Sequence, residues 1–271
     1  PYNQRLLAWI NQTLGASYTE INGAMQAFAT DQGAYNWSSM GTFSVDFSPE
    51  NLSGLFLWLD ASDAATITQV AGAVSQWNDK STNAFNVTQG TGANQPTTGS
   101  LTVNSLNALL FDGAGDSFSV PSGFNAISGG NNTAFWVYKT DTTKTRGWVM
   151  GGISTVFWGA SQNNAGAGTD LVASDGSGFP EIARIYDNGQ HMISMNRNGA
   201  VCTGTFDGTA VVGTGSTGSI ANTTIGQLGG SDFFKGGICE IVVYNRSLTA
   251  AEQLQVEAYL RTKWNTPQPI M

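Results

Sequence analysis

The stretch that decides the fold reads GLFLWLDASD and occupies residues 54–63. Five consecutive apolar residues, Leu55 to Leu59, predict a β-strand that is buried on both faces. The polar residues Asp60 to Asp63 follow directly and are typical of the turn that closes such a strand. This stretch therefore predicts a central strand of a substantial β-sheet.

Short strand candidates separated by Gly- and Asn-rich turns continue along the chain. Asn198-Gly199 lies between two of them and is a strong signal for a two-residue β-hairpin. Many short strands with regular turns predict a mainly β fold, either a two-layer sandwich or a barrel. The further strands predicted are Leu109–Phe111, Ser117–Val120, Ala134–Tyr138, Trp148–Met150, Thr155–Trp158, Ile182–Tyr186, His191–Met195, Ala200–Thr203 and Ile238–Tyr244.

The first 35 residues have the pattern of a short helical hairpin. Each of its two helices has an apolar stripe at helical spacing, and Thr19 and Gly33 are placed to begin and end the second helix. A hairpin this small cannot hold a core alone, so its stripes are expected to dock on the sandwich, on a second copy of the chain or on another protein. The stripe residues are Leu6, Leu7, Ile10 and Leu14, then Ile21, Met25 and Phe28.

The end of the chain predicts a single amphipathic helix. Thr249-Ala250-Ala251-Glu252 is a capping box, and Pro267 is expected to end the helix. The apolar face consists of Val256, Tyr259, Leu260 and Trp264. The predicted organisation is a helical docking segment at 1–35, a connector at 36–53 and a sandwich with the C-terminal helix at 54–271.

The low and acidic charge content of the chain limits which molecules it is expected to bind. Only 11% of the residues are charged, the formal net charge is -8, and the pI is about 4.4. The 11 Lys and Arg residues are scattered, which argues against nucleic acid as a partner. No apolar run is long enough to span a membrane, and the residues from Pro1 to Arg5 lack a secretory signal pattern, so we expect neither membrane insertion nor export by that route.

Seven ordered blocks resemble the bacterial and phage laminin-G-like, concanavalin A-like domains. The blocks are Gly54–Asp63, Val74–Ser81, Asn94–Pro96, Leu110–Gly113 with Asp116, Ile225–Gly230, Gly237–Arg246 and Leu248–Glu252. The resemblance covers about Gly54 to Trp264 and implies a jelly-roll sandwich of two antiparallel sheets. Because this fold hosts lectins, adhesion modules, enzyme appendages and virion proteins, the resemblance does not by itself fix a function.

The residue pattern gives no catalytic site. The Glu-x-Asp-x-x-Glu run of glucanases with this fold does not occur, and Glu181 and Glu240 are expected to be isolated surface carboxylates at strand ends. His191, the single histidine, is not accompanied by a nucleophile elbow. Cys202 and Cys239 are expected to be free buried thiols, although a disulfide between them remains open. We therefore expect a non-enzymatic protein without a zinc site.

Two kinds of ligand site remain as hypotheses. Aspartates gather in the turns of the family blocks, and many laminin-G-like domains hold calcium at the sandwich rim, so calcium binding is one hypothesis; the other is that these aspartates cap turns. No cofactor is required. The aspartates are Asp60, Asp63, Asp79, Asp112 and Asp116.

Tryptophans supply the second hypothesis. Trp148 and Trp158 lie on short strands near Gly-rich loops, where an exposed ring is able to stack on a sugar. Trp58, Trp77 and Trp264 are expected to be packing residues of the sandwich.

Two functions from different classes follow from these observations. The first is a phage virion structural protein, either a head decoration protein, a head fibre or a tail adhesin. Its N-terminal stripes would bind capsid or tail proteins, its sandwich would face host glycans, and we expect a homo-oligomer. The alternative is a carbohydrate-binding or adhesion module of an exported bacterial protein, located at the cell surface.

Overall fold

The computed structural model describes residues 47–127, 130–141, 147–151, 161–162, 188–214 and 223–267. The predicted docking segment and the strand candidates Thr155–Trp158 and Ile182–Tyr186 lie outside these residues. The strands are β1 Leu55–Asp60, β2 Ile67–Val70, β3 Ala73–Trp77, β4 Val87–Thr88, β5 Thr97–Val103, β6 Leu106–Asp112, β7 Phe118–Ser119, β8 Asn131–Thr140, β9 Gly147–Trp148, β10 Met150–Gly151, β11 Ser161–Gln162, β12 Gln190–Asn198, β13 Val201–Phe206, β14 Thr209–Thr214, β15 Thr224–Ile225 and β16 Lys235–Tyr244. Short 3-10 turns occur at Pro49–Asn51, Ala64–Thr66, Gly92–Asn94 and Ser122–Ala126, and the helix α3 spans Ala250–Trp264.

The predicted mainly β sandwich is confirmed, with one difference in how its layers connect. A single hydrogen-bonded sheet of 14 strands runs in the order β10-β15-β7-β4-β3-β5-β6-β16-β8-β12-β13-β14, with β1 on β16 and β2 on β3. The two layers that the resemblance implied as separate sheets are thus joined at β5. This strand pairs with β3 only at Thr97, changes register before Leu101, and bends at Gly99, whose φ is +81°.

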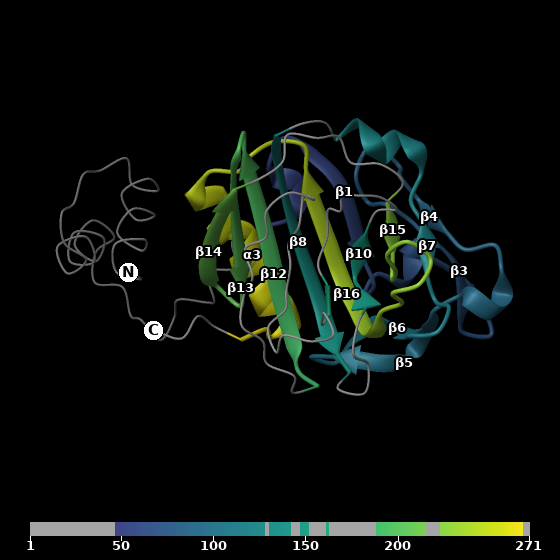
Figure 1. Ribbon diagram of the computed structural model, residues 1–271. Coiled ribbons are helices and arrows are strands. Elements are labelled where there is room, and N and C mark those ends of the chain that lie inside the picture. Colours follow the sequence, from purple (N-terminus) through teal and green to yellow (C-terminus); the bar gives the residue numbers. More distant parts are fainter. Residues whose placement is uncertain are drawn as a thin grey trace, which may run out of the picture.

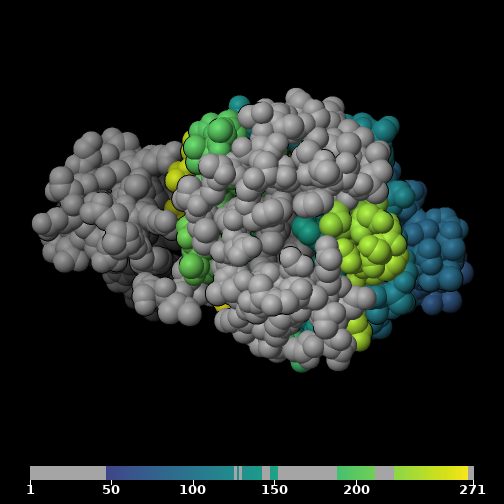
Figure 2. Space-filling model, viewed as in Figure 1, coloured from purple at the N-terminus to yellow at the C-terminus, as the bar shows by residue number. Residues whose placement is uncertain are grey.

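The sheet folds over a single inner core. Trp136 of β8 and Ile193 of β12 share one buried cluster with Trp77 of β3 and Phe118 of β7. The long strands β16, β8 and β12 lie side by side (Figure 1). One face of these strands packs on the inner core, and α3 packs on the opposite face. Figure 2, viewed the same way, shows the yellow-green segment around β15 at the surface beside the blue strands that follow β1.

The helix α3 covers the outer face of the central strands. Alternate residues of β8 point to opposite sides, so that Trp136 enters the inner core while Phe135 and Val137 pack with Val256 and Leu260 of α3. This alternation explains why Ala134–Tyr138 of β8 and Leu55–Leu59 of β1 are continuous apolar runs. The predicted burial of β1 on both faces is confirmed.

The predicted ends of α3 are correct at one side only. The capping box is present, with the Thr249 hydroxyl accepting from the Glu252 backbone N–H and the Glu252 carboxylate accepting from the Thr249 N–H. The helix ends at Trp264, because Asn265 adopts a left-handed conformation with φ +51°, and not at Pro267.

Two local predictions are also settled. The hairpin between β12 and β13 is confirmed, but its two turn residues are Gly199 and Ala200, since Asn198 still pairs with Val201. Both cysteines are buried thiols that lie in different clusters and form no disulfide with each other. No helix in the described ranges is long and apolar enough to cross a membrane.

A β-bulge in β16 decides which way its only acid points. Ile238 pairs with Tyr138 and Glu240 pairs with Val137, so Cys239 is the extra residue between them. Ile238 faces the inner core, and strict alternation would turn Glu240 towards the same apolar core. The bulge shifts the alternation by one residue and turns Glu240 towards α3 instead.

Candidate functional site

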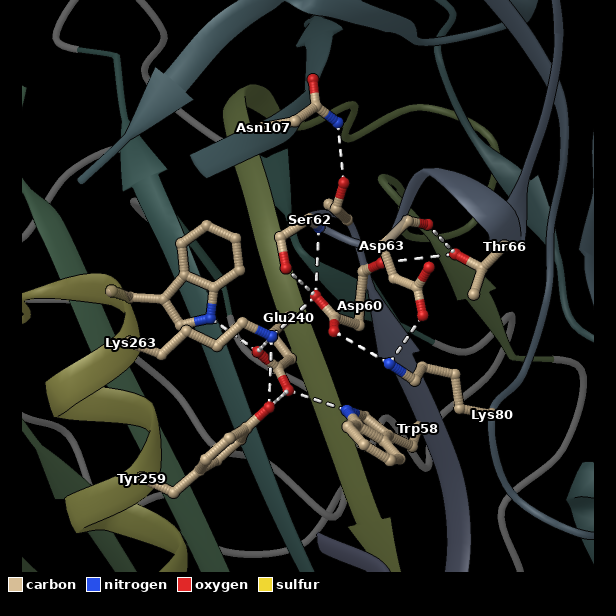
Figure 3. A network of polar contacts seen from close by, with 12 residues as sticks. Trp58, Asp60, Ser62, Asp63, Thr66, Lys80, Asn107, Glu240, Tyr259 and Lys263 are labelled. Atoms are coloured by element: carbon tan, nitrogen blue, oxygen red, sulfur yellow. Dashed lines mark hydrogen bonds and ion pairs between the residues drawn. The ribbon is translucent and has the colours of Figure 1, made fainter. Parts of the chain in front are cut away.

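Glu240 is the centre of a polar cluster enclosed between β1, β16 and α3 (Figure 3). Its side chain is 0% exposed. Oε1 accepts from Trp58 Nε1–H at 2.7 Å and from the Tyr259 hydroxyl at 2.9 Å. Oε2 accepts from Trp264 Nε1–H at 2.6 Å and lies 2.8 Å from Lys263 Nζ. Four donors on two elements therefore satisfy a carboxyl group that has no contact with water.

Asp60 lies beside Glu240 and shares the same lysine. Its Oδ1 is 2.8 Å from Lys263 Nζ and accepts from the Ser62 N–H and Oγ–H at 3.0 and 2.6 Å. Its Oδ2 is 3.2 Å from Lys80 Nζ, which also lies 2.8 Å from Asp63 Oδ2. The residues Trp58, Asp60, Asp63, Lys80, Glu240, Tyr259, Lys263 and Trp264 are called the Glu240 cluster below.

The surroundings shift the pKa values of Glu240 and Asp60 in opposite directions. Burial raises the pKa of Glu240, and the nearby charge of Lys263 only partly opposes this. Burial also acts against ionisation of Asp60, but Lys263, Ser62 and Lys80 together hold its pKa below the usual value. Asp60 is thus the stable carboxylate of the cluster, and Glu240 is the group that more readily holds a proton.

The prediction that Glu240 is a surface carboxylate is wrong. The bulge at Cys239 and the cover of α3 bury Glu240, and neither is visible in the local sequence around it. Trp58 and Trp264 are buried as predicted, but they also donate hydrogen bonds to Glu240, a role that packing arguments missed. Trp77 is buried in the inner core as predicted.

The remaining aspartates of the calcium hypothesis act as turn caps in the structure. Asp112 Oδ1 accepts from the backbone N–H groups of Ala114, Gly115 and Asp116, and Asp116 Oδ2 accepts from the Asp112 N–H. Asp79 likewise accepts from three backbone N–H groups. Within the described ranges, no group of three or more His, Cys, Asp or Glu side chains is arranged to hold a metal ion. Asp60 and Asp63 share Lys80 and do not join Asp112 and Asp116 in one site.

Burial, and to a smaller degree the charge of Asp112, raise the pKa of Asp116 to about 6, although the Asp112 N–H acts in the opposite direction. Asp112 itself is more exposed, and its three backbone donors outweigh burial and lower its pKa. The pair therefore changes its charge near neutral pH.

Of the two proposed stacking residues, the structure describes only Trp148. Trp148 of β9 is 6% exposed, so it is packed inside the protein and offers no open ring face. Trp158 and the seven docking residues from Leu6 to Phe28 lie outside the described residues. Glycan stacking on Trp158 and docking through the N-terminal stripes therefore stay predictions.

His191 is a structural residue. Its side chain is 2% exposed, its Nδ1 is 2.8 Å from Asp207 Oδ2, and its ring stacks on Phe206 at 4.9 Å between centroids. Asp207 Oδ1 also accepts from the Met192 N–H, so this contact fixes the β12–β13 hairpin.

An open polar recess of about 420 Å³ lies where β8 begins and where β12 and β16 end. It is lined by Asn131, Asn198, Arg246, Ser247, Leu248 and Thr249. Arg246 is held in a bidentate pair with Glu252, with distances of 2.9 and 2.7 Å. The amide groups of Asn131 and Asn198 are on exposed residues at the mouth of this recess.

No family model matches the chain, and no curated protein matches it. Solved structures do resemble it. A Trypanosoma rangeli sialidase bound to a difluoro-KDN compound has a TM-score of 0.55 at 15% identity, covering 79% of this chain and 34% of that one. A second T. rangeli sialidase structure has a TM-score of 0.51 with the same identity and coverage. Domain 4 of AbnA, a GH43 extracellular arabinanase of Geobacillus stearothermophilus, has a TM-score of 0.47 at 16% identity, covering 75% of this chain and 97% of the domain.

The chain spans about a third of the length of the sialidases that it matches. At these identities the likeness concerns the fold alone. The fold of this chain is therefore a β-sandwich of the kind that forms one part of the larger T. rangeli sialidase.

Proposed function

We propose that the chain is a non-catalytic glycan-binding module. The observation that carries this proposal is the position of Asp60 and Glu240, which lie side by side beneath α3 and are 5% and 0% exposed. A glycosidase presents its two carboxyl groups to the substrate on either side of the scissile bond. Here both are covered and are neutralised by lysines, so this acid pair holds the helix in place and is not offered to a sugar.

The polar recess is the proposed contact for a glycan within the described surface. Sugars are recognised by a small number of fixed polar groups that bond their hydroxyls. Asn131 and Asn198 supply amides at the recess, and Ser247 and Thr249 supply hydroxyls. The backbone there is rigid, because Leu248 N–H donates to Thr133 Oγ1 and Asn196 Nδ2–H donates to the Leu248 carbonyl.

A glycan array of sialylated and neutral oligosaccharides, probed with the full chain, tests the proposal. We expect binding that falls at least tenfold in Asn198→Ala and is unchanged in Thr68→Ala, an exposed substitution on β2. Silence across the array contradicts glycan binding. Release of sugar from any bound oligosaccharide contradicts the non-catalytic part.

The virion role rests on a different part of the chain. The apolar stripes of residues 1–35 are the observation that favours a docking segment, and they suit attachment to a capsid or tail protein. Deletion of residues 1–35 is expected to abolish incorporation into particles and to leave the unfolding temperature of the sandwich unchanged. Unchanged incorporation contradicts the anchor.

A further inference from the structure

Lys263, Asp60 and Glu240 meet in an arrangement that neither packing nor glycan binding requires (Figure 3). Lys263 Nζ lies 2.8 Å from Asp60 Oδ1 and also 2.8 Å from Glu240 Oε2. The three side chains are 16%, 5% and 0% exposed. A primary amine, a carboxyl group and a second carboxyl group in contact with that amine are thus enclosed together, away from bulk water.

We propose that Lys263 and Asp60 condense to an intramolecular amide bond, between Lys263 Nζ and Asp60 Cγ, with Glu240 as the proton carrier. The inference starts from the same Asp60–Glu240 pair as the non-catalytic proposal, but no sugar takes part, so intact mass and a glycan array test the two proposals separately.

The atoms balance without any oxidant or co-reactant. Glu240 takes one proton from the Lys263 ammonium, and the freed nitrogen lone pair attacks Asp60 Cγ. Glu240 then passes its proton to an Asp60 oxygen, accepts the next proton from the nitrogen and delivers it to the same oxygen. The C–O bond breaks and water leaves. Of the three ammonium hydrogens one stays on the amide nitrogen, two leave in the water, and Glu240 returns to its starting state.

The surroundings favour the attack and the loss of water. Ser62 donates two hydrogen bonds to Asp60 Oδ1, and Lys80 lies against Oδ2, so both oxygens that become more negative during the attack are already stabilised. Against the effect of burial, the same contacts hold the pKa of Asp60 low, so Glu240 has to deliver the protons that the leaving oxygen needs. Glu240 is able to hold a proton because burial raises its pKa. Condensation replaces two buried charges by a neutral amide, which removes their desolvation penalty. Enclosure beneath α3 keeps water from reversing the reaction.

Lys80 provides an internal comparison. It also contacts Asp60, at 3.2 Å, but its second partner is Asp63, which is half-exposed at 34%, and not Glu240. The proposed bond is therefore specific to Lys263. Lys235, whose ion pair is with Asp141 and not with a member of the Glu240 cluster, is the control lysine.

The intact mass of the full chain under denaturing conditions tests this proposal. We expect a mass lower than the sequence mass by one water molecule, and trypsin is expected to release residues 6–80 joined to residues 262–271. Lys263→Arg keeps the positive charge and is expected to restore the sequence mass, whereas Lys235→Arg keeps the deficit. Glu240→Gln is expected to leave a larger share of the purified chain at the full sequence mass, since it lacks the proton carrier.

Two results overturn the proposal. One is the full sequence mass in the purified wild-type chain. The other is a water deficit that persists in Lys263→Arg, which would place the dehydration elsewhere, for example as a succinimide at Asp112-Gly113. Because the wild-type peptide map alone decides the question, an unstable variant does not leave it open.

Discussion

The indole N–H of Trp264 donates to Oε2 of Glu240 across 2.6 Å and fixes the last turn of α3 to the bulged part of β16. The bond is charge-assisted when Glu240 is ionised, and it lies where the helix ends. It therefore couples the position of α3 to a single buried carboxyl group.

Trp264→Phe tests this coupling. The substitution keeps a large ring but removes the N–H, and hydrogen bonds to charged groups contribute about 1.5–3 kcal/mol. We expect the free energy of unfolding, measured in urea, to fall by more than in Trp77→Phe. Trp77 is the matched control because its buried Nε1 has no hydrogen-bond partner in the described part of the chain. Equal losses in the two variants would remove the special role of Trp264.

Asp116 predicts an unusual pH dependence. The pKa of Asp116 is raised from 3.8 to about 6, so the folded state holds its proton more tightly than the unfolded state does. Stability from this group is thus complete below about pH 4 and is lost as the pH rises through 6. Asp116→Asn keeps an oxygen acceptor for the Asp112 N–H and does not ionise. We expect it to be more stable than wild type by about 1–3 kcal/mol at pH 8, and no more stable near pH 4. A stability difference that is the same at both pH values contradicts the assignment.

Calcium binding is tested with the same pair of residues. Calcium at Asp112 and Asp116 would stabilise only the ionised wild type, since it binds carboxylate oxygens. If the hypothesis holds, millimolar calcium raises the unfolding temperature of wild type at pH 8 and leaves that of Asp116→Asn unchanged. Magnesium is the control, and no calcium-dependent shift in wild type ends the hypothesis for this turn.

The turn after β15 has no room for a side chain at Gly226. Its φ is +84°, and a Cβ there would lie 2.4 Å from Phe111 Cε1. Gly226→Ala therefore combines an unfavourable backbone with overpacking, and we expect a loss of about 3 kcal/mol or more. Gly229 has φ +61° but open space around it, so Gly229→Ala is expected to lose only about 1–2 kcal/mol. Urea unfolding of both variants separates the two effects, and similar losses would show that sterics at Phe111 do not matter.

Local patterns predicted most of the elements, because their signals lie within a few residues. The apolar run from Leu55 to Leu59 and the capping box from Thr249 to Glu252 are both of this kind, and both are confirmed. Asn265 adopts a left-handed conformation and ends α3 before Pro267 is reached. A proline in the sequence therefore shows only how far a helix is able to extend, and not where it ends.

The Glu240 cluster was not predictable in this way. Glu240 and Asp60 are 180 positions apart, and a bulge of a single residue decides their meeting. From the sequence of β16 alone, Glu240 is a single charged residue in an apolar strand. Its hydrogen-bond and ion-pair partners come from β1 and α3, which are distant in the sequence. A sequence signal exists only in hindsight, since Trp58 and Glu240 fall in blocks that resemble one family and Trp264 is at the end of the stretch that the resemblance covers.

The neighbouring positions of β1 and α3 also determine how the chain bears mechanical force. The chain enters the sandwich at Leu55, and Lys263 meets Asp60 at the far end of the same strand. Tension applied at Leu55 and at Trp264 would run along the backbone of β1 and cross to α3 at this contact, without passing through the strands in between. We therefore expect the contacts between the last turn of α3 and the end of β1 to resist such tension first, before the strands in between are loaded.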